Sequence, residues 1–231
     1  MNSVIEGLKN GLIVSCQARP GNPLRGADHM AAMAQAAEMG GAAAIRADGI
    51  EDITEIRKRV KIPIIGIYKT EPSPEIPYIT PDFDHAKAIA ELGVEIIALD
   101  ATLRPRPNGV DVAELIGRIK RELGVLVMAD IATFEEGVYA AKAGADIVAT
   151  TLSGYTTYTP FTKEPDYKLI SELHDAIKTP IIAEGRFVSP EDIARGIRAG
   201  AHAVVIGKAI TNIQFSTDRF IKEAAELLKE E

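Results

Sequence analysis

The sequence predicts one closed (β/α)8 barrel, a TIM barrel, that spans residues 1–231 as a single domain. Three observations favour this fold. Short apolar runs alternate with longer stretches rich in Ala and Leu, and eight such pairs fit within the chain. Glycine recurs just before the next apolar run, which suggests one strand–helix unit used many times. No linker or change of composition divides the chain.

An open doubly wound sheet is the main alternative, because it is built from the same strand–helix units. Such sheets often carry a GxGxxG turn after the first strand. Here the corresponding residues are Cys16-Gln17-Ala18-Arg19-Pro20-Gly21, which lack that pattern. The closed barrel is therefore the preferred prediction.

The apolar runs are typical of parallel strands that are buried on both faces. We expect strands at residues 11–16, 42–46, 62–68, 95–99, 126–129, 146–150, 181–184 and 203–206. Several of the intervening helices end in glycine, which takes up the left-handed conformation that stops a helix. These glycines are Gly40 or Gly41, Gly93, Gly124, Gly144 and Gly200.

Helix starts are marked as well. Thr80-Pro81, Asp111 and Ser189-Pro190 are predicted N-caps, and Thr133 stands three residues before Glu136, the spacing of a capping box. Residues 216–228 have the apolar spacing of an amphipathic helix. We expect this last helix to close the outer ring of the barrel, with the contact surface of a homodimer as the alternative.

Composition limits the classes of partner. The net charge of −7 argues against nucleic acid or an anionic membrane surface. Cys16 is the only cysteine, which excludes an internal disulfide and a cysteine-rich metal cluster. The first residues lack a basic-then-apolar signal pattern, and no apolar run is long enough to span a membrane. We therefore expect a cytoplasmic protein.

Polar residues follow or end nearly every predicted strand, although the strands themselves are almost wholly apolar. In a barrel these ends converge on one mouth, where barrel enzymes build their sites. In chain order they are Gln17, Arg46, Lys69, Asp100, Asp130, Thr150, Glu184 and Gly207.

Lys69 and Glu184 are the predicted acid–base pair. Burial or a nearby cation, such as Arg46 on the neighbouring strand, would lower the pKa of Lys69 so that it can act as a base. Glu184 ends a strand four positions further round the barrel and so faces Lys69 across the mouth. Asp130 either binds a substrate hydroxyl or caps the next helix. Asp100 is predicted to be structural and to bond loop backbone.

The seventh and eighth strands end in a pattern suited to phosphate. Residues 181–192 pass from an apolar run through Glu184, Gly185 and Arg186 to the next helix start, and the eighth strand is followed by Gly207 and Lys208. Bare glycines let backbone N–H groups approach a phosphate, and the two basic residues add charge. Barrels commonly bind phosphate in these two loops.

Metal chemistry is not indicated, because none of His29, His85, His174 and His202 ends a predicted strand. A Schiff-base aldolase or lyase stays open as an alternative, since Lys69 could attack a carbonyl carbon. A non-catalytic protein that binds a sugar phosphate is the third hypothesis.

Short blocks along almost the whole chain resemble the N-acetylmannosamine-6-phosphate 2-epimerase family. The most telling are Cys16-Gln17-Ala18, Ile45-Arg46-Ala47, Gly66-Ile67-Tyr68-Lys69, Met128-Ala129-Asp130-Ile131, Thr150-Thr151-Leu152-Ser153-Gly154-Tyr155-Thr156, Ala183-Glu184-Gly185-Arg186 and Val205-Ile206-Gly207-Lys208-Ala209. Two positions depart from the family: Asn212-Ile213 stands where Arg-Pro is frequent, and Arg25 where His is usual.

The resemblance implies a phosphate-binding barrel that converts N-acetylmannosamine 6-phosphate to N-acetylglucosamine 6-phosphate in sialic acid breakdown. It implies no metal and no organic cofactor, with an N-acylated hexosamine 6-phosphate as the small-molecule substrate. Lys69 and Glu184 would be the acid–base residues. The substrate-binding residues would be Gln17, Arg46, Asp130, Gly154, Gly185, Arg186, Gly207 and Lys208.

Overall fold

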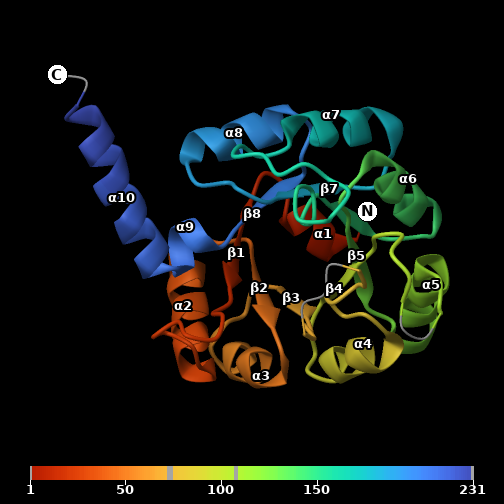
Figure 1. Ribbon diagram of the computed structural model, residues 1–231. Coiled ribbons are helices and arrows are strands. Elements are labelled where there is room, and N and C mark those ends of the chain that lie inside the picture. Colours follow the sequence, from red (N-terminus) through yellow and green to blue (C-terminus); the bar gives the residue numbers. More distant parts are fainter. Residues whose placement is uncertain (1, 72–74, 107–108, 230–231) are drawn as a thin grey trace.

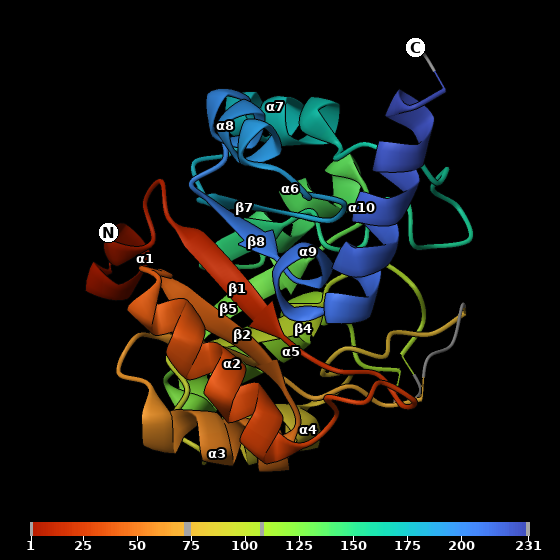
Figure 2. The same cartoon turned by 90° about the vertical axis from the view of Figure 1, so that its left-hand side faces the viewer.

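The computed structural model describes residues 2–71, 75–106 and 109–229. Its eight parallel strands form a closed barrel in sequence order (Figure 1). They are β1 Leu12–Cys16, β2 Ala44–Asp48, β3 Ile64–Ile67, β4 Ile96–Asp100, β5 Leu126–Asp130, β6 Ile147–Ala149, β7 Ile181–Glu184 and β8 Ala203–Ile206. The (β/α)8 prediction is confirmed, and the open sheet is wrong because β1 pairs with β8. Figure 2 shows this join.

Helices cover the outside of the barrel. They are α2 Ala27–Met39, α3 Ile50–Arg59, α4 Phe83–Ala90, α5 Val112–Leu123, α6 Phe134–Lys142, α7 Tyr167–Ala176 and α8 Pro190–Arg198, with α1 Ser3–Gly7 before the first strand and α9 Lys208–Thr211 and α10 Ile213–Leu227 after the last. Among the described residues, no helix is long and apolar enough to cross a membrane.

The apolar side chains form two layers. Because side chains alternate along a strand, Ile65 and Ile67 of β3 belong to the layer inside the barrel, while Ile64 belongs to the layer between strands and helices. Ile5 and Leu8, from α1 and the residue after it, join the inner layer and so close the end of the barrel opposite the mouth. The mouth at the carboxyl ends of the strands is left for polar groups.

Most predicted helix signals are confirmed. Thr133 and Glu136 form a capping box before α6, as Ser189 and Asp192 do before α8, and Asp111 caps α5. The expected left-handed backbone is present at Gly41, Gly93, Gly124, Gly144 and Gly200.

Thr80 is not an N-cap; Asp82 caps α4 instead. The Thr80 hydroxyl donates to the carbonyl of Ala98 on β4 and accepts the N–H of Tyr68. This buried threonine, with φ of +44°, therefore holds the loop after β3 against the barrel.

The prediction that the last helix closes the outer ring is wrong. None of the residues described in α10 is buried, and the helix extends away from the barrel (Figure 1). Its start is held by Arg219, which donates to the carbonyl of Val188. Asn212, one of the two departures from the family, caps α10 by accepting the N–H of Phe215. The amphipathic pattern correctly predicted a helix here, but the expectation that its apolar face packs on the barrel was wrong.

The packing of β3 generates a stability prediction. A Cβ added at Gly66 would lie 2.5 Å from Ile89 Cγ2 and 3.0 Å from Val94 Cγ1. Gly66→Ala should therefore overpack the layer behind β3 and lower the free energy of unfolding by about 1–3 kcal/mol in urea titrations. Gly7→Ala is the control, because nothing lies within 4 Å of its added Cβ. Equal midpoints for the two variants would contradict this account.

Candidate active site

Three of the predicted residues form a buried cluster at the centre of the mouth. The Arg46 guanidinium binds the Asp130 carboxylate through both of its terminal nitrogens, at 3.1 and 2.5 Å. Arg46 Nη1 also lies 3.1 Å from Glu184 Oε2. Arg46 and Asp130 are 1% and 0% exposed, while Glu184 keeps 15% of its side chain exposed. Of the two carboxylates, Glu184 is thus the one a ligand can reach.

Arg46 lies in the middle of β2 rather than at its end, which corrects the predicted strand boundary. The strand continues through Ala47 and Asp48, which pair with Gly66 and Ile67 of β3. The inward direction of position 46 places the guanidinium inside the barrel. Burial alone would lower the pKa of Arg46, but Asp130 and Glu184 outweigh it, so the pKa is raised and the side chain stays charged.

Lys69 is held by the segment that returns after β3. Residue 69 forms an antiparallel bridge with Ile79, and its N–H donates to Asp48 Oδ1 at 2.9 Å. The Lys69 ammonium donates to the side-chain oxygen of Gln17. Gln17 in turn donates to the Ser15 hydroxyl at 2.8 Å. The structure thus brings together Gln17 and Lys69, the residues that follow β1 and β3.

The surroundings of Lys69 lower the pKa of its amine. Burial is the largest cause that lowers its pKa, and the charges of Arg46 and Arg19 act in the same direction. Asp48 and Glu184 oppose them. The Lys69 N–H is bound by Asp48 of β2, and Arg46 of the same strand contacts Glu184, so the predicted pair lies on either side of β2 side chains at the mouth.

Glu184 is shifted the other way. Burial raises the pKa of its carboxyl above the ordinary value, and the charge of Asp130 adds to the rise. The charges of Arg46 and Lys69 act against it. The backbone of Glu184 is fixed by Thr150, whose hydroxyl accepts the Glu184 N–H and donates to its carbonyl. A raised pKa moves the carboxyl toward the range in which it can both give and take a proton, which suits acid–base work.

Asp130 and Asp100 have separate tasks. Asp130 does not cap the next helix, since Thr133 does, so the capping alternative is wrong. The structural role of Asp100 is confirmed: it is fully buried and binds the N–H and hydroxyl of Thr102 and the guanidinium of Arg104. These contacts fix the loop after β4.

Glu136 joins three loops at the mouth. Its Oε1 accepts from the N–H of Leu103 at 3.1 Å and from the hydroxyl of Tyr158 at 2.6 Å. Its Oε2 accepts the N–H groups of Ala132 and Thr133 at 2.8 and 3.1 Å. The loops after β4, β5 and β6 therefore meet on one buried carboxylate.

The glycines of the predicted phosphate site lie at the ends of two paired strands. Gly185 follows β7 with φ of +111°, and Gly207 follows β8 and precedes α9. Lys208 is exposed at the start of α9. Arg186 donates to the carbonyls of Ser153 and Glu164 and so holds the loop after β6.

Gly154 has a packing reason to be glycine. Its φ is +77°, and an added Cβ would lie 2.9 Å from Nη1 of Arg186. The Arg186 guanidinium therefore passes where a side chain at position 154 would stand. Both residues belong to the arrangement that fixes the loop after β6.

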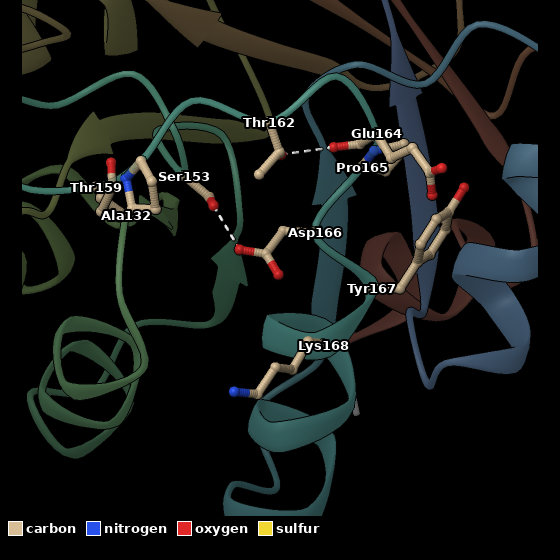
Figure 3. Close-up of a pocket in the computed structure, with 10 residues that line it drawn as sticks. Ala132, Ser153, Thr159, Thr162, Glu164, Pro165, Asp166, Tyr167 and Lys168 are labelled. Carbon is tan, nitrogen blue, oxygen red and sulfur yellow. Dashed lines mark hydrogen bonds between the residues drawn. The ribbon is translucent and has the colours of Figure 1, made fainter.

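A cavity of about 310 Å³ lies beneath that loop and is separate from the acid–base cluster (Figure 3). The Ser153 hydroxyl donates to Asp166 at 2.6 Å across it, and Asp166 also caps α7. Its lining includes Thr159, Pro160, Thr162 and Lys168, and it shares no residue with the group formed by Arg46, Lys69, Asp130 and Glu184. The bond between Ser153 and Asp166, drawn as a dashed line in Figure 3, ties together the two ends of the loop after β6.

Two residues at the mouth were missed by the sequence analysis. Asp48 was outside the predicted strand, and it binds the backbone of Lys69. The signal that would have found it is the inward–outward alternation of Arg46, Ala47 and Asp48. Thr151 belongs to one of the blocks that resemble the family, but the sequence assigned it no role. Its hydroxyl lies 2.7 Å from Asp130 Oδ1 and 3.1 Å from Glu184 Oε2. The loop after β6 contains several threonines, and no sequence pattern indicates which of them contacts the carboxylates.

Comparison with known proteins gives one consistent family. The family model described as "Putative N-acetylmannosamine-6-phosphate epimerase" matches residues 30–226. A protein of Caldanaerobacter subterraneus named putative N-acetylmannosamine-6-phosphate 2-epimerase is 49% identical over 219 residues, which cover 94% of this chain and 92% of that one. A relative of the same name from Cutibacterium acnes is 46% identical, covering 90% and 91% of the two chains.

The solved structure of the N-acetylmannosamine-6-phosphate 2-epimerase from Clostridium perfringens is similar throughout. The TM-score is 0.91 at 45% identity, with 96% of each chain covered. The chain therefore belongs to the N-acetylmannosamine-6-phosphate epimerase family.

Proposed function

We propose that this protein inverts C2 of N-acetylmannosamine 6-phosphate to give N-acetylglucosamine 6-phosphate. The observation that carries the proposal is the shared site of Lys69 and Glu184. Burial lowers the pKa of the Lys69 amine and raises the pKa of the Glu184 carboxyl, so both pKa values move toward neutrality. Membership of the epimerase family supports the same reaction.

The reaction needs both groups. In the ring form of the sugar C1 is a hemiacetal carbon, and the C2 proton is hardly acidic. Opening the ring creates an aldehyde, and removal of the C2 proton then gives a planar enediol-type intermediate. Lys69 and Glu184 assist ring opening and exchange protons at C2, so that the proton returns to the opposite face. Each well-placed acid or base contributes on the order of 10²–10⁴ in rate.

Arg46, Gln17 and Asp130 orient the sugar in this proposal. Arg46 is charged and lies 3.1 Å from Glu184, so its positive charge favours an oxygen that gains negative charge beside Glu184. Gln17 holds the Lys69 ammonium in the free enzyme and is close enough to bind the same substrate atoms. Asp130 fixes the Arg46 guanidinium from behind.

The phosphoryl group is proposed to lie between the loops after β7 and β8. Gly185 and Gly207 offer main-chain N–H groups without a Cβ in the way, and Lys208 supplies positive charge. Arg186 contributes its charge while its guanidinium holds Ser153 and Glu164, and Gly154 leaves the space that this guanidinium needs. Binding energy at the phosphate then positions C2 between the two acid–base groups.

Isotope exchange tests the function. With N-acetylmannosamine 6-phosphate in deuterated water and a chelator present, the enzyme should place solvent deuterium at C2 of the product. Lys69→Ala and Glu184→Gln should each slow exchange and turnover by about 10²–10⁴, because each removes one proton carrier. Lys61→Ala is the matched control, since this exposed lysine precedes the same strand at the opposite end of the barrel.

Three outcomes would contradict the epimerase mechanism. Full turnover in Lys69→Ala would remove Lys69 from the reaction. An imine on Lys69 that borohydride traps during turnover would favour the aldolase or lyase alternative. Binding of the sugar phosphate without any turnover would favour the non-catalytic alternative.

Substitution of Asp48 should shift the pH dependence of kcat/KM. Among the charges that raise the pKa of Lys69, Asp48 has the largest effect. Asp48→Asn keeps an oxygen for the Lys69 N–H but removes the negative charge, so the pKa of Lys69 should fall further. Lys69 then becomes a free base at lower pH. The limb of the kcat/KM profile that reports Lys69 should move toward lower pH. Glu51→Gln, an exposed site on α3, should leave this limb in place.

We also propose that the protein forms a homodimer through α10. Ile213, Phe220 and Leu227 recur every seven residues and are 64%, 66% and 66% exposed. A stripe with this period is self-complementary and suits pairing with the same stripe of a second copy.

Light scattering on the purified protein tests the dimer. The wild-type chain should give the mass of two chains, and Phe220→Glu should give the mass of one, because a charge would be buried in the contact. Lys222→Gln changes the other face of the helix and should stay dimeric. A wild-type protein that is monomeric at micromolar concentration would refute the proposal.

A further inference from the structure

A single hydroxyl lies between the two carboxyl groups of the mouth. Asp130 ends β5, Thr151 follows β6 and Glu184 ends β7, so three neighbouring strands place these side chains in a row. Thr151 Oγ1 is 2.7 Å from Asp130 Oδ1 and 3.1 Å from Glu184 Oε2. Because the hydroxyl has one hydrogen, it can donate to only one of these oxygens at a time.

The same two oxygens share a second donor. Arg46 Nη1 lies 3.1 Å from Asp130 Oδ1 and 3.1 Å from Glu184 Oε2. Asp130 has a further bond, to Arg46 Nη2 at 2.5 Å, whereas Glu184 has none from that nitrogen. Asp130 therefore keeps two hydrogen bonds from Arg46 when the Thr151 hydroxyl turns away. An ionised Glu184 has fewer donors, so a hydrogen bond from Thr151 stabilises it more.

Counting hydrogens gives two arrangements in which every group is satisfied. When Glu184 is protonated, its hydrogen points to the Thr151 oxygen and the Thr151 hydrogen points to Asp130. When Glu184 is ionised, the Thr151 hydrogen turns to Glu184 and Asp130 keeps its two bonds from Arg46.

We propose that Thr151 is a positioning residue whose hydroxyl hydrogen turns from Asp130 to Glu184 each time Glu184 gives its proton to the substrate. The proton that moves is that of Glu184, and Thr151 keeps its own hydrogen throughout. When Glu184 takes a proton back, the hydroxyl returns to Asp130. The inference rests on the proposed acid–base role of Glu184.

The charged groups around Glu184 determine how its pKa should change when the Thr151 hydroxyl is removed. They are Arg46, Asp130 and Lys69, and Lys69 in turn feels Asp48 and Arg19. Burial raises the pKa of Glu184, and Thr151 acts against that rise, because its hydrogen bond to the ionised carboxylate is stronger than the bond it accepts from the neutral carboxyl. Removal of the hydroxyl should therefore raise the pKa of Glu184 further.

Thr151→Val removes the hydroxyl and keeps the shape of the side chain. The limb of the kcat/KM profile that reports Glu184 should move to higher pH, and kcat/KM should fall about tenfold, the effect of losing one hydrogen bond to a charged group. Thr151→Ser should restore the position of the limb. Thr151→Ala is a second variant without the hydroxyl, in case valine disturbs the loop.

Thr150→Val is the matched control, because the Thr150 hydroxyl binds the backbone of Glu184 and no carboxylate. It should leave the limb in place even where it lowers stability. If Thr151→Val and Thr151→Ala both keep the wild-type limb, or if Thr150→Val shifts it equally, the proposal is overturned.

An infrared titration of the free enzyme separates this inference from the proposed function. The carboxyl band of Glu184 is assigned by its loss in Glu184→Gln, and its midpoint should move upward in Thr151→Val. A moved midpoint together with full activity in Glu184→Gln would refute the catalytic role of Glu184 while upholding the contact with Thr151. An unmoved midpoint would refute the role of Thr151 alone.

Discussion

The buried guanidinium of Arg46 is the group on which the mouth of the barrel depends. It balances Asp130, which is wholly buried, and reaches Glu184, which is not. Removing one member of such a pair leaves an uncompensated charge and costs about 3–5 kcal/mol. The same guanidinium lowers the pKa of both Lys69 and Glu184. One side chain thus couples the stability of the barrel to the protonation of the residues assigned to the chemistry.

Much of the fold follows from local signals. Runs such as Ile181-Ile182-Ala183 can only be buried strands in a chain with this spacing, and left-handed glycines such as Gly124 end the helices where the sequence indicates. The grouping of Arg46, Lys69, Asp130 and Glu184 could be predicted because parallel strands of a barrel bring their carboxyl ends to one mouth. Family resemblance then selected one reaction among those that such a mouth can support.

The rest depends on contacts between distant segments. The limit of β2 was misplaced because Arg46 interrupts an apolar run, and only its pairing with Asp130 makes a charged residue acceptable inside the barrel. Thr80 looks like a helix cap, yet its hydroxyl is taken by β4. The apolar stripe of α10 predicts a partner surface but does not say which one. Thr151 gains its meaning only when β5, β6 and β7 are placed side by side.

The carboxylate of Glu136 has a consequence for how this enzyme can change in evolution. Four donors from the loops after β4, β5 and β6 converge on it. A segment transplanted from another barrel into any one of these loops would strip donors from a buried negative charge. A change in one of the three loops therefore requires matching changes in the others, whereas the loops after β1, β7 and β8 donate no hydrogen bond to Glu136 and can vary independently of it.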